Sequence, residues 1–276
     1  MRETPFHITL KDRELTIVLL DLIGSTAFVQ SVGRVRAARW LQYHDRLTRS
    51  LIYKYDGREI DRSDGFLLSF AAPIDALNFA LHYQRTIPKK TKLEARIGLH
   101  TGRIVEVTQD ELMIGLGAKG VELEGIAKNV AARVMSVCQR RQVLMTKDTM
   151  DLVKNRTNSF TPKGTRFACV GLYKFKGVKE PQELYAVGES IEVLQPPPSS
   201  DKVKRLGGPK HIRSRARQRR AKEWISWIFW RVAIVAFLYG AYIVGFIMTN
   251  KASRRIFGMY DYDWIDDWIR AIKSIF

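Results

Sequence analysis

The feature that most constrains this chain is a long apolar run near its C-terminus. Residues 224–248, WISWIFWRVAIVAFLYGAYIVGFIM, contain a single charged side chain, Arg231. About 20 consecutive apolar residues are enough for a helix to cross a bilayer, and the tryptophans at the start of the run suit a membrane–water interface. The sequence therefore predicts a transmembrane helix over 224–248. The alternative is a helix buried in a protein core.

The charges beside this run predict its orientation. The chain carries a formal net charge of +18, and residues 201–223 contain ten Lys and Arg residues against two acidic ones. Because positively charged flanks stay on the cytoplasmic side of a membrane, the N-terminal part of the chain should face the cytoplasm. We therefore expect a single-pass protein of the cell inner membrane, with its globular part cytoplasmic.

The basic segment itself has three interpretations. Solvated linkers, surfaces that bind anionic lipid headgroups and arms that bind nucleic acid all contain such runs. Proteins that bind single-stranded nucleic acid place aromatic residues among the basic ones. The segment KVKRLGGPKHIRSRARQRR (202–220) contains no aromatic residue. We expect the membrane surface as its partner, and no nucleic acid.

Composition divides the chain into four segments. Residues 1–193 form a globular domain, 194–223 a linker that is first rich in Pro and Ser and then basic, 224–248 the transmembrane helix and 249–276 a C-terminal tail. The tail carries apolar residues at helical spacing: Trp264, Ile265, Trp268, Ile269, Ile272 and Phe276. This pattern predicts an amphipathic helix that lies in the membrane interface or packs against a partner protein.

The cysteines and the first residues indicate the compartment of the globular domain. Cys138 and Cys169 stand outside any CxxC spacing, which fits a reducing compartment and argues against a metal site built from thiolates. The segment MRETPFHITLKDRELT is too polar for a secretory signal peptide.

Within residues 1–193, apolar β-rich runs alternate with helical patterns. The run LTIVLLDL (15–22) precedes a helical stretch that continues to Tyr55. Further strand-like runs lie at 65–71, 95–107, 111–115, 142–146 and 183–187, and helical patterns at 74–85 and 123–138. Strands that alternate with helices around a central hairpin predict an α/β fold, in which helices cover a sheet.

Acidic residues end two of these strands. Asp21 closes the first strand, and Gly-Ser-Thr then opens a helix whose N–H groups and dipole favour an anion. Asp64 lies at the tip of the hairpin REIDRSDGFLLSF (58–70). Turn geometry alone also favours such residues. Two carboxylates at adjacent strand ends are, however, what two-metal phosphoryl transfer requires.

Five blocks, taken in order, resemble the catalytic domain of the class III nucleotidyl cyclases, the adenylate and guanylate cyclases. They are LLDLIGST (19–26), SDGFLLSF (63–70), ARIGLHTGRIVEV (95–107), EGIAKNVAARVMSVCQRRQVLMT (124–146) and GLYKFKGVKEPQELYAVG (171–188). The resemblance covers roughly residues 14–188 and implies an α+β sandwich with a ferredoxin-like βαββαβ core. It also implies a lyase that converts a nucleoside triphosphate into a 3′,5′-cyclic nucleotide and pyrophosphate. Such a second messenger requires a downstream effector that binds it.

The resemblance implies a metal site and a phosphate site. Asp21, Asp64 and the backbone carbonyl of Leu22 match the ligands of two Mg²⁺ or Mn²⁺ ions in each active site. The family's phosphate-cradling turn is matched by Gly24, Ser25 and Thr26.

The remaining matches imply a dimer. Asn129 and Arg133 match the catalytic pair that orients the ribose and stabilises the pentavalent phosphorus, and Lys176 matches the residue that grips the terminal phosphates. In this family two domains pair head to tail, and the metal aspartates of one face the Asn–Arg helix of the other. The resemblance therefore implies a homodimer with two interface sites.

Two base-selecting positions depart from the family pattern. Adenylate cyclases carry Lys and Asp there and guanylate cyclases Glu and Cys, whereas this chain has Ile60 and Glu122. Ile60 offers no hydrogen bond to a base; Glu122 could accept one and Arg62 could donate one. The departures resemble the bacterial anti-phage pyrimidine cyclases, which make cyclic UMP or cyclic CMP, and we expect UTP or CTP as substrate. The alternatives are an adenylate cyclase that makes cyclic AMP and a degenerate nucleotide-binding module without catalysis.

Overall fold

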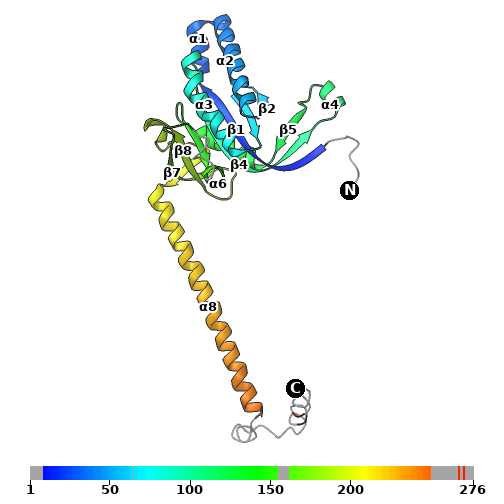
Figure 1. Cartoon of the computed structure of the whole chain (residues 1–276), viewed down its shortest axis with the longest axis vertical. Helices are drawn as coiled ribbons and strands as arrows, with labels where there is room; N and C mark the ends of the chain where they lie inside the picture. The colour runs from blue at the N-terminus through cyan, green and yellow to red at the C-terminus, as the bar shows by residue number, and fades with distance from the viewer. Residues whose placement is uncertain (1–8, 64, 155–161, 250–266, 268–269, 271–276) are drawn as a thin grey trace. The chain divides into compact units, whose positions relative to one another are not determined.

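The computed structural model describes residues 9–63, 65–154, 162–249, 267 and 270 (Figure 1). The chain divides into two compact units, Met1–Ile212 and Arg213–Phe276. The first unit contains the sheet and its covering helices.

The described part of the first unit is built on one nine-stranded mixed sheet. Its strands are β1 (Thr9–Ile23), β2 (Gly57–Arg62), β3 (Gly65–Phe70), β4 (Glu94–Thr108), β5 (Val121–Glu124), β6 (Val143–Thr146), β7 (Arg166–Phe175), β8 (Gln182–Gly188) and β9 (Val203–Gly207). They lie in the order β2-β3-β1-β4-β6-β8-β7-β9, and β5 pairs with β4 beside this path. Only the β4–β6 pair is parallel among the described pairs.

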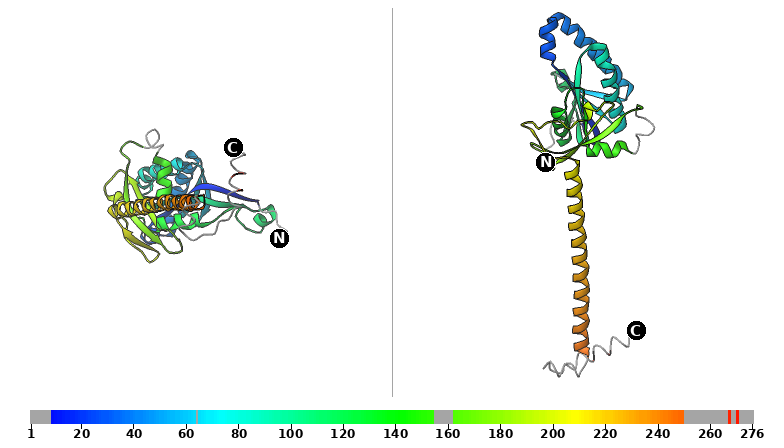
Figure 2. Two further views of the ribbon diagram at one scale, coloured as in Figure 1. Left: turned by 90° about the horizontal axis from the view of Figure 1, so that it is seen from below. Right: turned by 90° about the vertical axis from the view of Figure 1, so that its left-hand side faces the viewer.

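Helices cover both faces of this sheet. The helices of the described chain are α1 (Ser25–Val32), α2 (Arg34–Lys54), α3 (Pro73–Thr91), α4 (Glu111–Gly115), α5 (Ile126–Val137), α6 (Lys147–Lys154), the short 3-10 helix η1 (Glu192–Leu194) and α8 (Pro209–Thr249). Those that pack on the sheet include α2, α3 and α6 on one face and α5 on the other. Figure 2 shows α2 and α3, in blue and cyan, beside each other. The order β1, α1–α2, β2–β3, α3, β4 is the predicted βαββαβ core, so the α/β fold class is confirmed.

The two faces follow from the alternation of side chains along β1. Successive residues of a strand point to opposite faces. Val18 and Leu20 pack into the cluster that contains residues of α2, α3 and α6, whereas Leu15 and Ile17 pack against Ala127 and Ala131 of α5. β1 is therefore buried on both faces, which is why LTIVLLDL reads as a continuous apolar run.

Helix α4 replaces a strand predicted over 111–115. Asp110 precedes it, and its side chain accepts a 2.8 Å hydrogen bond from the Met113 N–H. A capping aspartate satisfies an N–H group that a strand ladder would otherwise have to pair. The apolar residues of ELMIG suggested a strand, but a five-residue run is too short to show whether its apolar residues repeat at the period of a strand or of a helix.

The sheet also extends past the predicted domain boundary at residue 193. β9 pairs antiparallel with β7, and Val203 is buried in the cluster that includes Tyr173 and Phe175. The segment 194–223, predicted as a linker, therefore contains the last strand of the sheet and the first turns of α8.

Helix α8 runs continuously for 41 residues through the basic segment and the predicted transmembrane segment. Its residues Trp227–Phe246 form a stretch long and apolar enough to cross a membrane, and none of that stretch is buried inside the protein. The tail beyond Thr249, with its predicted amphipathic helix, lies outside the described residues except for Asp267 and Arg270, which form an ion pair at 2.7 Å.

Helix α5 lies so close to β4 that only glycine fits between them. A Cβ at Gly98 would lie 2.4 Å from the backbone N of Met135 and 2.7 Å from its Cα.

We expect Gly98→Ala to lower the free energy of unfolding by about 1–3 kcal/mol, because overpacking forces the helix off the sheet. Gly115→Ala is the matched control, since its Cβ would meet nothing within 4 Å. Thermal unfolding of both variants checks this; equal melting temperatures would contradict it.

Candidate active site

Asp21 lies near the end of β1, between two antiparallel neighbours. It is paired with Gly65 of β3 on one side and with Arg96 of β4 on the other. Its side chain is 24% exposed. The next residue, Leu22, is buried and pairs with Ala95. The predicted metal residue is thus held by backbone pairing on both sides, with its carboxylate reaching solvent.

The hairpin tip approaches β1 closely. Gly65 has room for no side chain, because a Cβ there would lie 2.0 Å from the Leu20 carbonyl oxygen. Asp64 itself lies outside the described residues. Gly65, which directly follows Asp64 in the sequence, pairs with Asp21.

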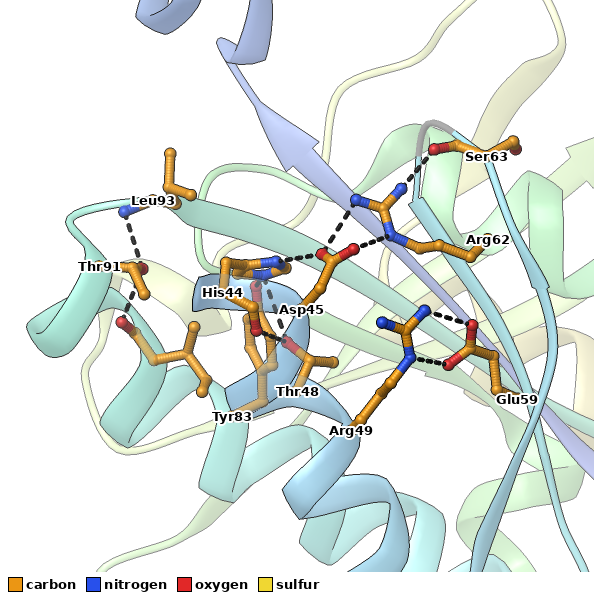
Figure 3. A network of polar contacts seen from close by, with 11 residues as sticks. His44, Asp45, Thr48, Arg49, Glu59, Arg62, Ser63, Tyr83, Thr91 and Leu93 are labelled. Carbon is orange, nitrogen blue, oxygen red and sulfur yellow. Dashed lines mark hydrogen bonds and ion pairs between the residues drawn. The ribbon is translucent and has the colours of Figure 1, made fainter. Parts of the chain in front are cut away.

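A polar network holds this hairpin to helices α2 and α3 (Figure 3). Arg62 donates from Nε and Nη2 to the two oxygens of Asp45, each at 3.1 Å, and from Nη1 to the Ser63 carbonyl. Asp45 contacts His44 Nδ1 at 3.0 Å, and His44 Nε2 contacts the Tyr83 hydroxyl at 2.7 Å. The network thus connects the residue before Asp64 to the helical layer.

Burial sets the charge state inside this network. The His44 ring is fully buried, and desolvation lowers its pKa, an effect that the adjacent Asp45 carboxylate partly offsets. The Asp45 carboxylate contacts this ring and Arg62 at the same time. The Arg62 guanidinium also lies 4.8 Å from the centre of the Phe66 ring, within the range of a cation–π contact.

This arrangement bears on the suggestion that Arg62 reaches a base. In the described chain Arg62 is bound to Asp45, Ser63 and Phe66. A nucleotide base would have to compete with Asp45, which accepts two charge-assisted hydrogen bonds from Arg62, for the same guanidinium.

The turn after β1 has the geometry expected of a phosphate cradle. Gly24 adopts the left-handed conformation, with φ 70°, and α1 begins at Ser25. The first hydrogen bond of the helix runs from the Phe28 N–H to the Gly24 carbonyl at 2.9 Å. The backbone N–H groups of Ser25 and Thr26 therefore have no partner within the helix.

The predicted catalytic pair lies on α5, on the face of the sheet opposite α2 and α3. Asn129 is exposed; Arg133 is partly buried, and its Nε is a buried atom that finds no hydrogen-bond partner among the described residues. An unpaired buried donor is costly unless a ligand or partner satisfies it.

Within one chain Asn129 is remote from Asp21. Ala127 lies 3.3 Å from the Cβ position of Gly102, whose partner on β1 is Leu15. Leu15 precedes Asp21 by six residues, which at the rise of an antiparallel strand is about 20 Å. Helix α5 runs toward the Asp21 end, where Ser136 accepts from Arg96. Asn129 is about 3 Å further along the helix than Ala127, so it lies about 17 Å from Asp21.

Lys176 is remote as well. It follows β7, and β4, β6 and β8 stand between β7 and β1. Four interstrand spacings amount to about 19 Å. One chain therefore brings Asp21, Leu22, the Gly24–Thr26 turn and the hairpin together, but brings neither Asn129 nor Lys176 to them.

The predicted base-selecting residues lie on two strands, β2 and β5, that are near each other. Ile60 occupies a bulge in β2, between Glu59 and Asp61, and packs against the apolar cluster on the α5 side of the sheet. Glu122 lies in β5, which the ion pair between Lys119 and Asp61 ties to β2. Ile60 thus presents an apolar surface beside a segment that carries a carboxylate.

His100, which we did not assign to the site, is a core residue. It is 7% exposed, and its Nδ1 lies 2.8 Å from the Thr146 hydroxyl. Burial lowers its pKa to about 4.

Sequence reasoning missed Arg96, which contacts the Asp21 carboxylate at 2.9 and 2.7 Å. No short-range motif joins residues 75 positions apart. The antiparallel pairing of the two strands could have indicated the contact, but the register was not known.

The donor chemistry fits a divalent cation. The described residues contain no cluster of three His, Cys, Asp or Glu side chains, and Asp64 falls outside that search. The partly exposed Asp21 carboxylate, the Leu22 backbone carbonyl and the Asp64 carboxylate that the sequence supplies are hard oxygen ligands of the kind that Mg²⁺ prefers.

Comparison with known proteins agrees with this geometry. The family model of the adenylate and guanylate cyclase catalytic domain matches residues 10–189. The adenylyl cyclase CyaB of P. aeruginosa shares the fold with a TM-score of 0.57 and 17% identity, over 67% of this chain and 99% of that one.

Two curated relatives are each 26% identical over 71% of this chain. They are the receptor-type adenylate cyclase ESAG 4 of Trypanosoma brucei brucei and the serine/threonine-protein kinase pkn2 of Myxococcus xanthus. The matches cover only 19% and 22% of these longer proteins.

Proposed function

Because this chain belongs to the adenylate and guanylate cyclase catalytic domain family, and is thus a class III nucleotidyl cyclase, we propose that it works as a homodimer with two shared active sites. Domains of this family work as dimers on a nucleotide substrate, generally with divalent metal ions. The proposed reaction is conversion of a nucleoside triphosphate into a 3′,5′-cyclic nucleotide and pyrophosphate.

The separation of two residue sets in one chain carries this proposal. Asp21 and the hairpin lie at one end of β1, whereas Asn129 lies about 17 Å away along β1 and Lys176 about 19 Å away across the sheet. Arg133 is nearer to Asp21, because it precedes Ser136 by one turn of α5 and Ser136 accepts from Arg96, so the separation concerns Asn129 and Lys176. A head-to-tail dimer places the second set of one protomer against the first set of its partner. The orphaned Nε of Arg133 supports a ligand at that position.

The reaction is an in-line displacement. The ribose 3′-oxygen attacks the α-phosphorus, the bond to the bridging oxygen breaks, and pyrophosphate leaves. Asn129 orients the ribose, Arg133 donates to the oxygens of the pentavalent phosphorus, and Lys176 holds the terminal phosphates. The free N–H groups at the start of α1 bind phosphate oxygens.

Asp21, Asp64 and the Leu22 carbonyl would hold two Mg²⁺ or Mn²⁺ ions. Such ions make the 3′-hydroxyl more acidic and neutralise charge on the phosphates. The contribution of the chain itself is to hold Asp21 opposite Gly65, the residue that follows Asp64, in the β1–β3 ladder.

The base is proposed to be a pyrimidine, with UTP preferred and cyclic UMP as product. The apolar side chain at position 60 leaves the polar edge of a purine unpaired, whereas Glu122 offers an acceptor to a smaller base.

A pyrimidine product would suit antiviral defence with a downstream effector. That role predicts protection of cells from phage by the wild type and none by Asp21→Ala; equal plaque counts would contradict it.

We also propose that α8 anchors the enzyme. The domain to residue 193, with the added strand β9, would then be cytoplasmic and joined through the basic part of α8 to one transmembrane span. The apolar stretch Trp227–Phe246 supports the span, and the basic residues before it support the inner-membrane orientation.

Removing the Asp21 carboxylate should abolish cyclisation. We expect Asp21→Ala to reduce turnover at least about 100-fold, because both metal positions lose a ligand. Asp12→Ala is the matched control on the same strand, since Asp12 is 53% exposed and pairs with the exposed Arg103. The measurement is cyclic nucleotide formed by the detergent-solubilised full chain with Mn²⁺. Substantial turnover by Asp21→Ala would contradict the metal assignment.

Mixed inactive chains should complement each other. A dimer of one Asp21→Ala chain and one Arg133→Ala chain contains one intact site and one doubly defective site. Co-expressed and purified through two different tags, this heterodimer should regain about half of the wild-type rate per dimer. A dead heterodimer would show that the site is not shared in this way.

Competition among the four nucleotides tests the base assignment. With equal concentrations of all four, we expect UTP or CTP to be cyclised faster than ATP or GTP. Each unpaired polar group on a purine costs about 1–3 kcal/mol. Ile60→Lys with Glu122→Asp should raise ATP use relative to the pyrimidine. A tenfold wild-type preference for ATP would instead support an adenylate cyclase.

Membrane attachment should survive high salt. An anchor that buries apolar residues is insensitive to ionic strength, whereas a basic surface on anionic lipid dissociates as salt screens it. We expect the full chain to stay in the membrane pellet in 1 M salt, where the Debye length is only about 3 Å and surface charge attraction is largely screened. Recovery in the soluble fraction would exclude the span.

A further inference from the structure

Arg96 contacts the Asp21 carboxylate through only one of its oxygens. Nε and Nη2 donate to Oδ2 at 2.9 and 2.7 Å. No described residue makes a hydrogen bond to Oδ1. Two donors of one planar guanidinium on a single oxygen fix that oxygen firmly and leave the other available.

The guanidinium is itself held in place. Arg96 stands directly opposite Asp21 in the β1–β4 ladder. Its Nη1 donates to the Ser136 carbonyl at 3.3 Å, in the last turn of α5. The side chain is 32% exposed, so it is confined between β1 and α5 and is only partly screened by water.

This fixed positive charge affects any cation that binds Asp21. A divalent ion on Oδ1 would lie close to the guanidinium, and like charges at such a distance repel each other strongly outside bulk water. The same guanidinium removes the freedom of the carboxylate to rotate. Arg96 thus lowers the attraction of Asp21 for a free ion while it orients the oxygen that the ion would use.

We propose that Arg96 is a positioning residue for the metal site, and that it makes strong metal binding depend on the nucleotide. The phosphates of a nucleoside triphosphate supply the negative charge that Arg96 cancels on Asp21. The ion then binds tightly only together with the substrate. This inference rests on the proposed metal role of Asp21.

The test measures Mn²⁺ binding to the full chain in detergent, without nucleotide, from the electron paramagnetic resonance signal of the free ion. Arg96→Gln removes the charge and should tighten Mn²⁺ binding about tenfold, which corresponds to about 1.4 kcal/mol. The same substitution in an Asp21→Asn background should change nothing. Arg103→Gln is the matched control, because Arg103 lies on the same strand and pairs with Asp12 away from the site.

Activity gives the second readout. Arg96→Lys keeps the charge but has no planar pair of donors. Because the positive charge is kept, the Mn²⁺ affinity should stay within about threefold of the wild type. Turnover at saturating Mn²⁺ and nucleotide should fall about tenfold, because the carboxylate is less well oriented. This variant decides the question if Arg96→Gln fails to fold, as judged from its melting temperature.

The outcomes separate this inference from the proposed function. If Asp21→Asn weakens Mn²⁺ binding but Arg96→Gln does not tighten it, the role of Arg96 is overturned and the metal site stands. Wild-type turnover in Arg96→Lys also overturns it. If Asp21→Asn leaves Mn²⁺ binding unchanged, the metal role of Asp21 fails, and the inference fails with it.

Discussion

The pairing of β1 between β3 and β4 is the constraint on which the rest of this site depends. It sets Asp21 opposite Gly65 on one side and opposite Arg96 on the other. A slip of one residue would turn the Asp21 carboxylate to the opposite face of the sheet and bury it. The apolar residues on both faces of β1 oppose such a slip, because each face packs against a different set of helices. The register of the buried strand β1 therefore sets the position of the Asp21 carboxylate.

The hairpin depends on a second set of contacts. Gly65 admits the tip to β1, and the Arg62–Asp45–His44–Tyr83 network ties the neighbouring residues to α2 and α3. Burial lowers the pKa of His44, which disfavours a charged imidazolium inside this network. Ile60, in the bulge of the same strand, faces the other side of the sheet. The polar network and Ile60 thus lie on opposite faces of the hairpin, and Asp21, two residues after Leu19 on β1, lies on the face of Ile60.

Much of this was predictable from local signals. The strand before Asp21, the hairpin and the 124–146 block could be recognised because their patterns are short and contiguous. Contacts set by long-range register could not: Arg96 meets Asp21 across 75 residues, and Arg62 meets Asp45 across 17. The 111–115 run was misassigned because the Asp110 cap outweighed its strand propensity. Strand β9 was missed because its sequence, VKRLG, reads as part of a basic linker.

The central claim is that two chains build each active site. A structure of the full-length dimer with Mn²⁺ and a non-hydrolysable UTP analogue tests it most directly. The account predicts Mn²⁺ on Asp21 and Asp64 of one protomer, with Asn129, Arg133 and Lys176 of its partner on the ribose and phosphates of the same nucleotide. A nucleotide held by all five residues of a single protomer, or Mn²⁺ bound away from Asp21, would contradict it.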